Sequence, residues 1–501
     1  MTTNPVLLAA GSIVAWYVIS SLWTWYRLRH IPGPKLGAFS YLWVAWKVAR
    51  GRGMDYEHLS KYGPVVRVGP NYVVIDDPND LRRLNGNRTQ DARRDDWYSA
   101  TKMEPDHNML LSVLDAKSHD SLKARVSFGY SGRDNIDFDV AVNDQMTHFI
   151  DVLRHRFVSR PGGSSAGSDQ VKALDFAQFI RYFTLDTITK IAFGQAFGFM
   201  DHDGDLYGYT DEVERLLGVL ALAGDVPLLR HIFTTPVLAQ WFAARPTASN
   251  GVGKLLGIAH EIIDNRMAKK DAEAPDMIGS FMKHGMDIRE IKNETMLQIL
   301  AGSDTTATAI RSTMLYLMTS PRVYQRLKNE IKQAVASGVS KPISVDQAKQ
   351  LPYLQAVIFE GLRMRPPTTY GFYKIMPGSG EYIQDKFIPG GTAVGWNMPS
   401  LMRREDLFGP DTQLFRPERF LECTEEQRAE MIRNVELCFG YGRWMCAGKI
   451  LALVELNKMY FELLREFEWQ IVYPGNAWSE KAYTVYSQRD MWVSVTEAEA
   501  A

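Results

Sequence analysis

The stretch Phe439–Lys449 (FGYGRWMCAGK) carries the residue types of this 501-residue chain that are best suited to chemistry. Glycines flank Cys446 in it, and a helical pattern begins directly afterwards. The free N–H groups and the dipole of a helix N-terminus favour a thiolate and lower the thiol pKa, and glycines let a flat ligand approach the backbone closely. We therefore predict a thiolate ligand, with a buried structural cysteine in a glycine-rich turn as the alternative.

Two other kinds of site are excluded for this stretch. A phosphate loop follows the pattern G-x-x-x-x-G-K-[ST], whereas five residues separate Gly442 from Gly448 and Ile450 stands where Ser or Thr is needed. A zinc site needs Cys or His pairs at short ligand spacing, and the sequence contains no such pair.

A second cluster, Ala301–Thr306 (AGSDTT), interrupts a long helical pattern from Asp287 to Thr319. These residues are poor helix formers, and a run of poor helix formers inside a long predicted helix indicates a functional site. We expect Gly302 to let the helix open and Thr305 to place its hydroxyl in the gap instead of on the preceding turn. The alternative is a solvent-facing polar patch with a bend.

Other charged residues lie at helical spacing. Glu360 and Arg363 are three apart in a helix predicted over Pro352–Met364, and their neighbours are apolar, so we expect at least partial burial. His119 and Lys123 are four apart on another predicted helix, where the simplest interpretation is a solvated basic face.

The elements that position these residues are mostly helical. Helical periodicity dominates from about residue 140 to 365 and from 447 to 467, and strand patterns are confined to Val65–Ile75 and Tyr382–Val394. No tandem repeat or composition break divides the chain after residue 36. We predict a mostly α fold with a minor β-sheet, in one large domain over residues 36–501.

The composition excludes several classes of protein. With 57 Lys+Arg against 58 Asp+Glu, the chain has no basic surplus for nucleic-acid binding. Its 46% hydrophobic content is that of a globular protein and not of a disordered one. Three cysteines clustered near the C-terminus do not form a secreted disulfide framework.

The N-terminus has the pattern of a membrane anchor. Residues 1–26 carry no charge, and Val6–Tyr26 is long enough to cross a hydrocarbon core. Arg27, Arg29 and Lys35 follow, so the positive-inside rule places the bulk of the chain in the cytoplasm. We predict a transmembrane anchor over residues 1–27 and a basic, proline-rich hinge over 28–35; a cleaved signal peptide is the alternative.

From the hinge to the C-terminus the chain resembles the cytochrome P-450 family of haem-thiolate monooxygenases. The family motif F-x-x-G-x-R-x-C-x-G is matched by Phe439, Gly442, Cys446 and Gly448. Trp444 stands where the family has an arginine that pairs with a haem propionate, and Arg443 precedes it. An aromatic residue here is typical of fungal members that resemble pisatin demethylase. The resemblance implies haem b as cofactor and Cys446 as the axial iron ligand, whose electron donation favours O–O cleavage.

The resemblance also implies roles for the remaining candidates. Thr305 would hydrogen-bond iron-bound dioxygen, and Asp304 would relay protons. Glu360 and Arg363 match the family's E-x-x-R, and Arg419, in the P-E-R-F match at 417–420, would complete a buried structural network.

Because Trp444 carries no charge, we count His119, Lys123 and Arg443 among the cofactor-binding residues, the first two as replacement propionate partners. By the same resemblance the substrate pocket is lined by Leu297, Ala301 and residues 366–371. The apolar stretch 220–229 is either a lid or part of the core.

The family relationship implies partners as well. Electrons would come from NADPH through the flavins of a separate NADPH–cytochrome P-450 reductase, with cytochrome b5 as a second donor. The expected location is the endoplasmic reticulum membrane, with a single span and a cytoplasmic catalytic domain. The substrates would be O₂ and an apolar small molecule of fungal secondary metabolism.

Three alternatives to a monooxygenase stay open at this point. A haem-thiolate isomerase or dehydratase needs no reductase, but such enzymes often lose the Asp304–Thr305 pair that this chain keeps. A non-catalytic haem-binding or gas-sensing membrane protein is the second alternative, and an anchored helical scaffold without a cofactor is the third.

Overall fold

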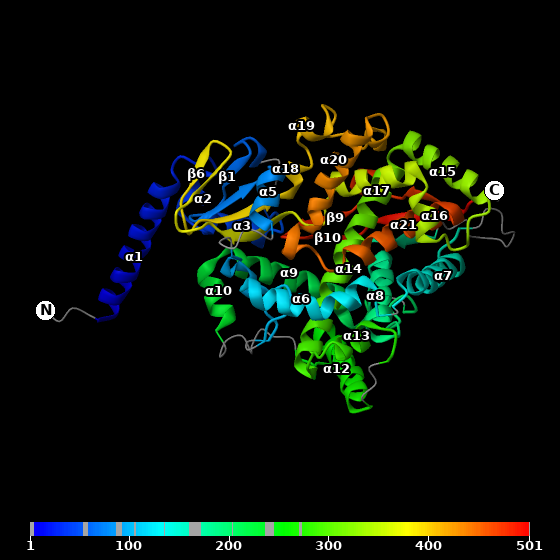
Figure 1. Cartoon of the computed structure of the whole chain (residues 1–501), viewed down its shortest axis with the longest axis horizontal. Coiled ribbons are helices and arrows are strands. Elements are labelled where there is room, and N and C mark those ends of the chain that lie inside the picture. Colours follow the sequence, from blue (N-terminus) through cyan, green and yellow to red (C-terminus); the bar gives the residue numbers. More distant parts are fainter. Residues whose placement is uncertain are drawn as a thin grey trace.

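The computed structural model describes residues 5–53, 59–86, 93–104, 107–134, 136–159, 172–202, 204–235, 245–269 and 273–499, with the backbone alone at 5–11, 13 and 14. Helices dominate this part of the chain (Figure 1). The α-helices are α1 (Pro5–Leu28), α2 (Lys35–Phe39), α3 (Leu42–Ala49), α5 (Pro78–Asn85), α6 (Ala116–Ser131), α7 (Phe138–Arg156), α8 (Phe176–Phe193), α9 (Tyr209–Asp225), α10 (Pro227–Thr234), α12 (Gly251–Lys269), α13 (Met277–Lys283), α14 (Ile288–Met318), α15 (Pro321–Ala336), α16 (Val345–Lys349), α17 (Pro352–Met364), α18 (Met398–Leu401), α19 (Glu405–Phe408), α20 (Glu425–Val435) and α21 (Lys449–Glu466). The 3₁₀ helices are η1 (Asp96–Thr101), η2 (Leu206–Gly208), η3 (Pro417–Phe420), η4 (Glu436–Phe439), η5 (Gly442–Trp444) and η6 (Pro474–Asn476).

The strands form small sheets at the edge of the helical body. They are β1 (Val65–Arg67), β2 (Tyr72–Ile75), β3 (Ala173–Asp175), β4 (Tyr370–Ile375), β5 (Glu381–Ile383), β6 (Lys386–Ile388), β7 (Ala393–Asn397), β8 (Phe467–Ile471), β9 (Ser479–Ala482), β10 (Tyr486–Arg489) and β11 (Trp492–Glu497). The largest described sheet has the order β1-β2-β7-β4, in which β2 and β7 are parallel and the other neighbours are antiparallel. The mostly α class with minor sheets is therefore correct.

The strand content is higher than the sequence indicated. The two predicted regions give β1, β2, β5, β6 and the start of β7, but β3, β4 and the C-terminal strands β8 to β11 were not predicted. These strands are short and carry charged residues, as in Ser479–Ala482 (SEKA), so their alternation of apolar and polar residues is weak. β11 pairs with β8 and β3, and β9 pairs with β10.

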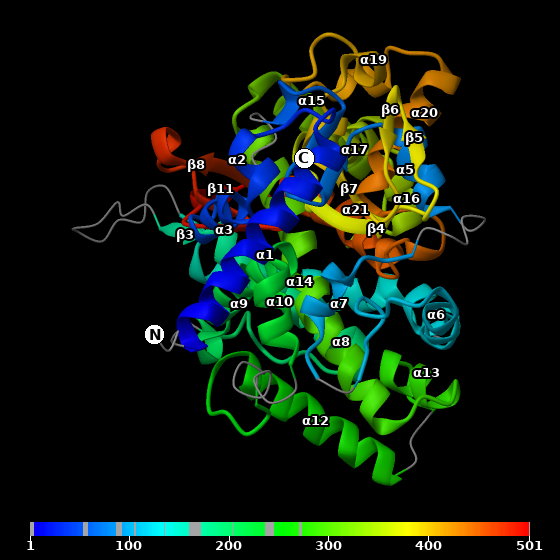
Figure 2. The same ribbon diagram turned by 90° about the vertical axis from the view of Figure 1, so that its left-hand side faces the viewer.

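Helix α14 runs through the middle of the helical body and packs against α8, α12, α17 and α21 (Figures 1 and 2). It begins at a capping box of Asp287 and Glu290 and extends over 31 residues, close to the predicted limits. Gly302 lies against α8, where a Cβ would come within 3.0 Å of Ile188. The glycine thus lets two long helices approach closely.

Helix α17 also occupies the predicted residues, Pro352–Met364. A capping box of Ser344 and Gln347 opens α16 immediately before it. The α17 helix packs between α14, α15, α16 and α21, which leaves most of its side chains buried, Glu360 and Arg363 included. This placement fixes the charged pair in the interior.

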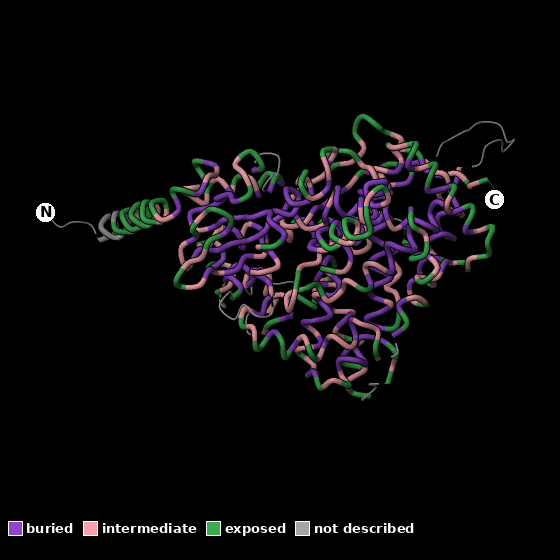
Figure 3. Tube along the Cα trace, turned by 45° about the horizontal axis from the view of Figure 1, so that its top comes forward, coloured by how far each residue is buried: buried purple, intermediate pink, exposed green. Residues whose placement is uncertain are grey.

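At the N-terminus, α1 ends at Leu28 and α2 starts at Lys35, so the proline-rich segment lies between two helices. The described side chains of α1 include exposed Trp16, Ile19 and Trp23, and the helix projects from the body (Figure 3). Its C-terminal half contacts α2, where Trp25 and Phe39 stack with ring centroids 5.5 Å apart. Among the side chains that the structure describes, no single helix is long and apolar enough to cross a membrane. One pair, Leu206–Asp225 with Pro227–Thr234, passes by length and composition but is bent by 116°. Part of the predicted anchor falls outside the described side chains, so the anchor stays a prediction.

The close contact of α17 with α14 predicts the effect of one substitution. A Cβ at Gly361 would overlap the Thr313 side chain on α14, so Gly361→Ala should destabilise the protein by about 1–3 kcal/mol despite the better helix propensity of alanine. Thermal unfolding measures this change. Gly378→Ala is the control because nothing lies within 4 Å of its Cβ position; equal melting temperatures of both variants would contradict the packing described.

Candidate active site

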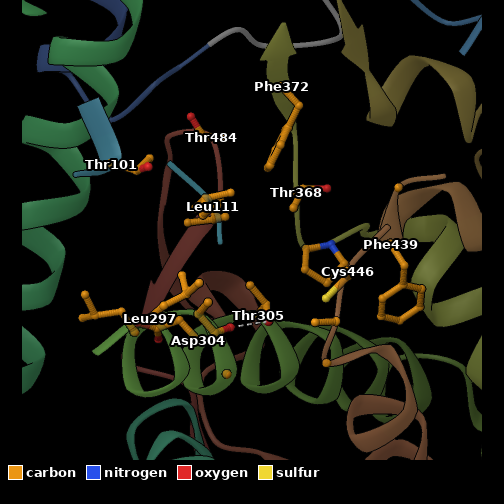
Figure 4. A pocket seen from close by; sticks show the side chains of 18 of the residues that line it. Thr101, Leu111, Leu297, Asp304, Thr305, Thr368, Phe372, Phe439, Cys446 and Thr484 are labelled. Carbon is orange, nitrogen blue, oxygen red and sulfur yellow. Dashed lines mark hydrogen bonds between the residues drawn. The ribbon is translucent and has the colours of Figure 1, made fainter. Parts of the chain in front are cut away.

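A cavity of about 390 Å³ lies between α14 and the loop that carries Cys446 (Figure 4). Its walls are mainly apolar and come from η1, α9, α14, β4 and the loop between β9 and β10. Of the residues predicted to line the pocket, Leu297, Ala301, Pro367 and Thr368 face this cavity, and so do Leu220 and Ala221 of the stretch predicted to be a lid or core. The 220–229 stretch therefore contributes a wall of the cavity from α9.

Cys446 is held at the cavity by a tight loop between η4 and α21. Its backbone N–H donates to the Phe439 carbonyl at 2.7 Å, and Gly440 and Gly442 take φ values of 78° and 62°, which favour glycine. Gly448 precedes α21, and a Cβ there would lie 3.9 Å from the Cys446 sulfur. The thiol is accessible from the cavity although it lies deep in the fold, and its sulfur is on the side of the loop that faces α14 (Figure 4).

The pKa of the Cys446 thiol is raised and not lowered, so the expected net direction of the shift was wrong. Burial raises the pKa of Cys446, and the opposing N–H groups of Gly448 and Lys449 and the Lys123 charge have smaller effects. Desolvation of a buried thiolate outweighs a helix dipole at this position. A coordinated metal ion deprotonates such a thiol, so the site is suited to a metal-bound sulfur more than to a free thiolate.

Thr305 lies on the stretch of α14 that faces the cavity, but its hydroxyl does not fill a gap in the helix. The Oγ1 atom donates to the Ala301 carbonyl at 2.9 Å, one turn back, and α14 is continuous through Gly302. The expected opening is therefore absent from this stretch, because intrahelical bonding satisfies both the hydroxyl and the carbonyl. The side chain still reaches the cavity wall (Figure 4).

Asp304 is adjacent to Thr305 and also borders the cavity. Its Oδ1 atom accepts from Arg181 Nε at 2.6 Å and lies 3.6 Å from Arg311 Nη2. All three side chains are almost completely buried, and Oδ2 has no hydrogen-bond partner among the described residues. The carboxylate thus stands between the cavity and a pair of buried arginines.

Glu360, Arg363 and Arg419 come together as a buried network. The Glu360 carboxylate accepts from Arg363 at 2.7 and 2.8 Å and from Arg419 Nε at 3.0 and 3.1 Å. Further N–H groups of the two guanidinium groups donate to backbone carbonyls of the segment 402–414. Each charge is compensated, so the network can hold the segment that precedes the Cys446 loop in place.

Helix α6 brings Lys123 to the Cys446 loop. Its Nζ atom donates to the carbonyls of Arg443 at 2.6 Å and Met445 at 2.9 Å, so it ties α6 to that loop. The Arg443 side chain lies 3.6 Å from Asp120 on α6. These two cations therefore already have contacts within the chain.

His119 lies one turn before Lys123 on α6, packed against Trp444 with ring centroids 4.3 Å apart. Burial, followed by the positive charge of Arg94, lowers the pKa of His119 to about 3. The ring is therefore neutral at physiological pH. It can offer a hydrogen bond to an anion but no charge.

Comparison with known proteins gives a family for this arrangement. A family model described as cytochrome P-450 matches residues 34–481. The chain belongs to the cytochrome P-450 family. It is 42% identical over 479 residues to cytochrome P-450 monooxygenase ABA1 of Pyricularia oryzae, covering 94% of this chain and 93% of the relative.

Other fungal monooxygenases of the family are similar. The protein named aba1 of Botryotinia fuckeliana is 41% identical over 476 residues (94% and 92% of the two chains), and abl1 of Leptosphaeria maculans is 37% identical over 477 residues (93% and 83%). This chain is thus a cytochrome P-450 monooxygenase with fungal relatives. None of these relatives is a pisatin demethylase.

The residues of this P-450 fit a haem with two propionates. Arg94 and Lys374 are both buried, and Arg94 Nε and Lys374 Nζ have no hydrogen-bond partner among the described residues. Buried cations are normally paired, so two open cationic donors beside the cavity require an anionic ligand. Cys446 would supply the thiolate ligand of the iron.

Arg94 and Lys374 were missed by the sequence analysis. Arg94 precedes η1, Lys374 lies on β4, and an isolated bridge joins their backbones 280 residues apart in sequence. No local spacing connects them. The one available signal was a lysine inside the aromatic strand Tyr370–Ile375 (YGFYKI).

A buried carboxylate fixes the cavity wall formed by α9. Asp225, at the end of α9, accepts from Trp97 Nε1 at 2.9 Å and from the Tyr370 hydroxyl at 2.6 Å. Burial raises the pKa of Asp225 to about 6. Three separate segments, η1, α9 and β4, are thus joined at the edge of the cavity.

Removing Glu360 should release haem. Glu360→Ala leaves Arg363 buried without a carboxylate and Arg419 with Asp411 alone, at 2.8 Å. An uncompensated buried charge costs about 3–5 kcal/mol, so haem content and melting temperature should both fall. Asp80→Ala is the control, since it removes a half-exposed partner of Arg83 at the same i,i+3 spacing and should cost no more than about 1 kcal/mol. Equal losses in both variants would contradict a special role of the buried network.

Asp225 should make stability depend on pH. Because its pKa is raised on folding, the folded chain binds the proton more tightly than the unfolded chain. The proton therefore adds to the free energy of unfolding at low pH, and this stabilisation is lost as pH rises from about 4 to 6. Asp225→Asn should therefore gain about 3 kcal/mol relative to wild type over that interval. Melting temperatures of both proteins across this pH range test the change, with exposed Asp385→Asn as control; a constant difference between wild type and Asp225→Asn would refute it.

Proposed function

We propose that this P-450 is a haem b enzyme that oxidises an apolar small molecule of fungal secondary metabolism with O₂ and electrons from NADPH. The observation that carries this proposal is the arrangement around one apolar cavity: a thiol on one wall, Thr305 on the other, and two open cations beside it. When bound, haem-thiolate iron activates dioxygen, so that one oxygen atom enters the substrate and the other leaves as water.

The chain's own residues bind and orient the cofactor and move protons. Cys446 ligates the iron, Phe439 and the loop glycines let the flat group approach, and Gly442 and Gly448 shape the loop. Thr305 turns its hydroxyl from the Ala301 carbonyl toward the cavity and donates a hydrogen bond there. Asp304, which borders both the cavity and Arg181, returns a proton to Thr305.

The apolar cavity wall supports an apolar substrate. Leu297 and Ala301 on α14 and Leu220 on α9 exclude water and leave few polar groups to orient the ligand. The fungal relatives support a role in secondary metabolism. The tryptophan at position 444 supports the narrower resemblance to pisatin-demethylase-like members, which we retain as part of the proposal.

We place the enzyme on the endoplasmic reticulum membrane through α1, with the catalytic domain in the cytoplasm. Exposed Trp16, Ile19 and Trp23 support this anchor, since aromatic and aliphatic side chains of this kind favour a bilayer and its interface. A separate NADPH–cytochrome P-450 reductase supplies the two electrons, and cytochrome b5 is a second donor. NADPH and flavins thus act only through a partner.

Turnover with labelled dioxygen tests the function. The full chain, purified with haem and mixed with reductase, NADPH and a panel of terpenoid and polyketide compounds, should transfer one labelled oxygen atom to a product. An isomerase or dehydratase would convert a substrate without NADPH, and a non-catalytic haem protein would convert none. Either of these results would reject the monooxygenase assignment.

Thr305→Ala should uncouple this reaction. Loss of a hydrogen bond worth about 1.5–3 kcal/mol lowers product per NADPH by about ten- to a hundred-fold, with peroxide formed instead. The control is Thr319→Ala, because the Thr319 hydroxyl makes the same bond to a carbonyl one turn back, at 2.7 Å, but at the end of α14. If both variants keep the wild-type ratio, Thr305 has no role in oxygen chemistry.

A further inference from the structure

The residue that departs from the family motif, Trp444, is surrounded by positive charge. Lys374 Nζ lies 3.7 Å from the centroid of its ring, and Arg94 Cζ lies 4.2 Å from it. Both distances are within the range of cation–π attraction, which is strengthened when the groups are removed from water. Trp444 thus contacts two buried cations that each have an open donor.

These two cations lack a carboxylate partner among the described residues. Arg94 Nη1 donates to the carbonyls of Leu110, Leu111 and Val113 at 2.8–3.0 Å, which fixes the guanidinium but leaves Nε open. Lys374 Nζ makes no hydrogen bond at all there. Burial lowers the pKa of Lys374 well below its usual value, which indicates how poorly its charge is stabilised within the chain.

The acidic side chains that follow Arg94 in the sequence, and Asp120 on α6, have other partners. Asp95 accepts from the Trp97 N–H and the Tyr72 hydroxyl, and Asp96 pairs with Arg230 at 3.1 Å. Asp120 lies 3.5 Å from His119 and 3.6 Å from Arg443. The positive charge near Trp444 is therefore open to a ligand.

We propose that Trp444 is a positioning residue that holds Arg94 and Lys374 by cation–π contact and presents them to the two propionates of the haem. This inference rests on the proposed haem-thiolate function. It differs from the family arrangement, in which an arginine at this position binds a propionate directly. Here the neutral indole ring stands at the position of that arginine. The positive charge comes from Arg94, which precedes η1, and from Lys374 on β4.

The surroundings explain why an arginine is unsuitable at position 444. A guanidinium in place of the indole would lie within about 4 Å of two buried cations, where like charges repel strongly because water does not screen them. Removing the ring would also remove the surface against which Arg94 and Lys374 are held. Trp444→Arg is thus expected to weaken haem binding even though it restores the family motif.

The test compares haem with haem dimethyl ester, which has the same ring and iron but no carboxylates. Four holoproteins are compared with wild type: Trp444→Phe, Trp444→Leu, Trp444→Arg and Lys374→Met. Each protein is loaded once with haem and once with haem dimethyl ester. Transfer of the bound haem or ester to excess apomyoglobin is followed by absorbance. The ratio of the two release rates measures recognition of the propionates separately from the general stability of the pocket.

Wild type and Trp444→Phe should hold haem much longer than its ester. Trp444→Leu, Trp444→Arg and Lys374→Met should release haem about 10- to 100-fold faster, while ester release changes little, so the preference for haem is lost. Lys386→Met, a lysine on β6 away from the cavity, is the control and should behave as wild type.

Two results would overturn the inference. If Trp444→Arg holds haem as long as wild type or longer, the position acts through a direct charge or not at all. If Trp444→Leu and Lys374→Met accelerate release of haem and ester equally, their role is only structural. Absence of any haem-thiolate spectrum in wild type would instead reject the proposed function, so the two failures are distinguishable.

Discussion

The feature on which this structure depends is uncompensated positive charge buried beside an apolar cavity. Arg94, which lines the cavity, and Lys374, which lies behind Trp444 of the cavity wall, each have an open donor. Removing a charge from water without a partner costs several kcal/mol. A fold that carries such a cost in its interior is built to bind an anion there. The thiol of Cys446 faces the same cavity and is also unfavourable as an anion until a metal ion binds it. Both features are explained by a single ligand that brings a cation and carboxylates.

Charged side chains in the scaffold differ from these two cations, because they have partners within the chain. Glu360 is shared by two arginines, and the remaining guanidinium N–H groups donate to backbone carbonyls, so that network is complete without a ligand. Lys123 likewise donates to carbonyls of the Cys446 loop. These satisfied charges differ from the open donors of Arg94 and Lys374, which our proposal assigns to the cofactor.

Much of this arrangement could be predicted from local sequence patterns. The limits of α17, the capping box before it, the long helix α14 and the cysteine loop follow from spacing and residue type. Arg94, Lys374 and Asp225 could not be predicted, because each meets its partners across long sequence separations. The thiol pKa and the direction of the Thr305 hydroxyl were mispredicted for a physical reason: burial and intrahelical bonding outweigh the effects that the local pattern indicates. The membrane anchor and the electron donors stay predictions.

The most direct test of this account is the spectrum of the reduced, carbon monoxide-bound protein with each cysteine replaced in turn by serine. We predict that wild type, Cys423→Ser and Cys438→Ser show the long-wavelength Soret band of a thiolate-ligated haem, and that Cys446→Ser loses it. Cys423 and Cys438 are suitable controls because one is partly and the other fully buried near the same loop. A thiolate spectrum that persists in Cys446→Ser, or that is missing from wild type, would contradict the central claim.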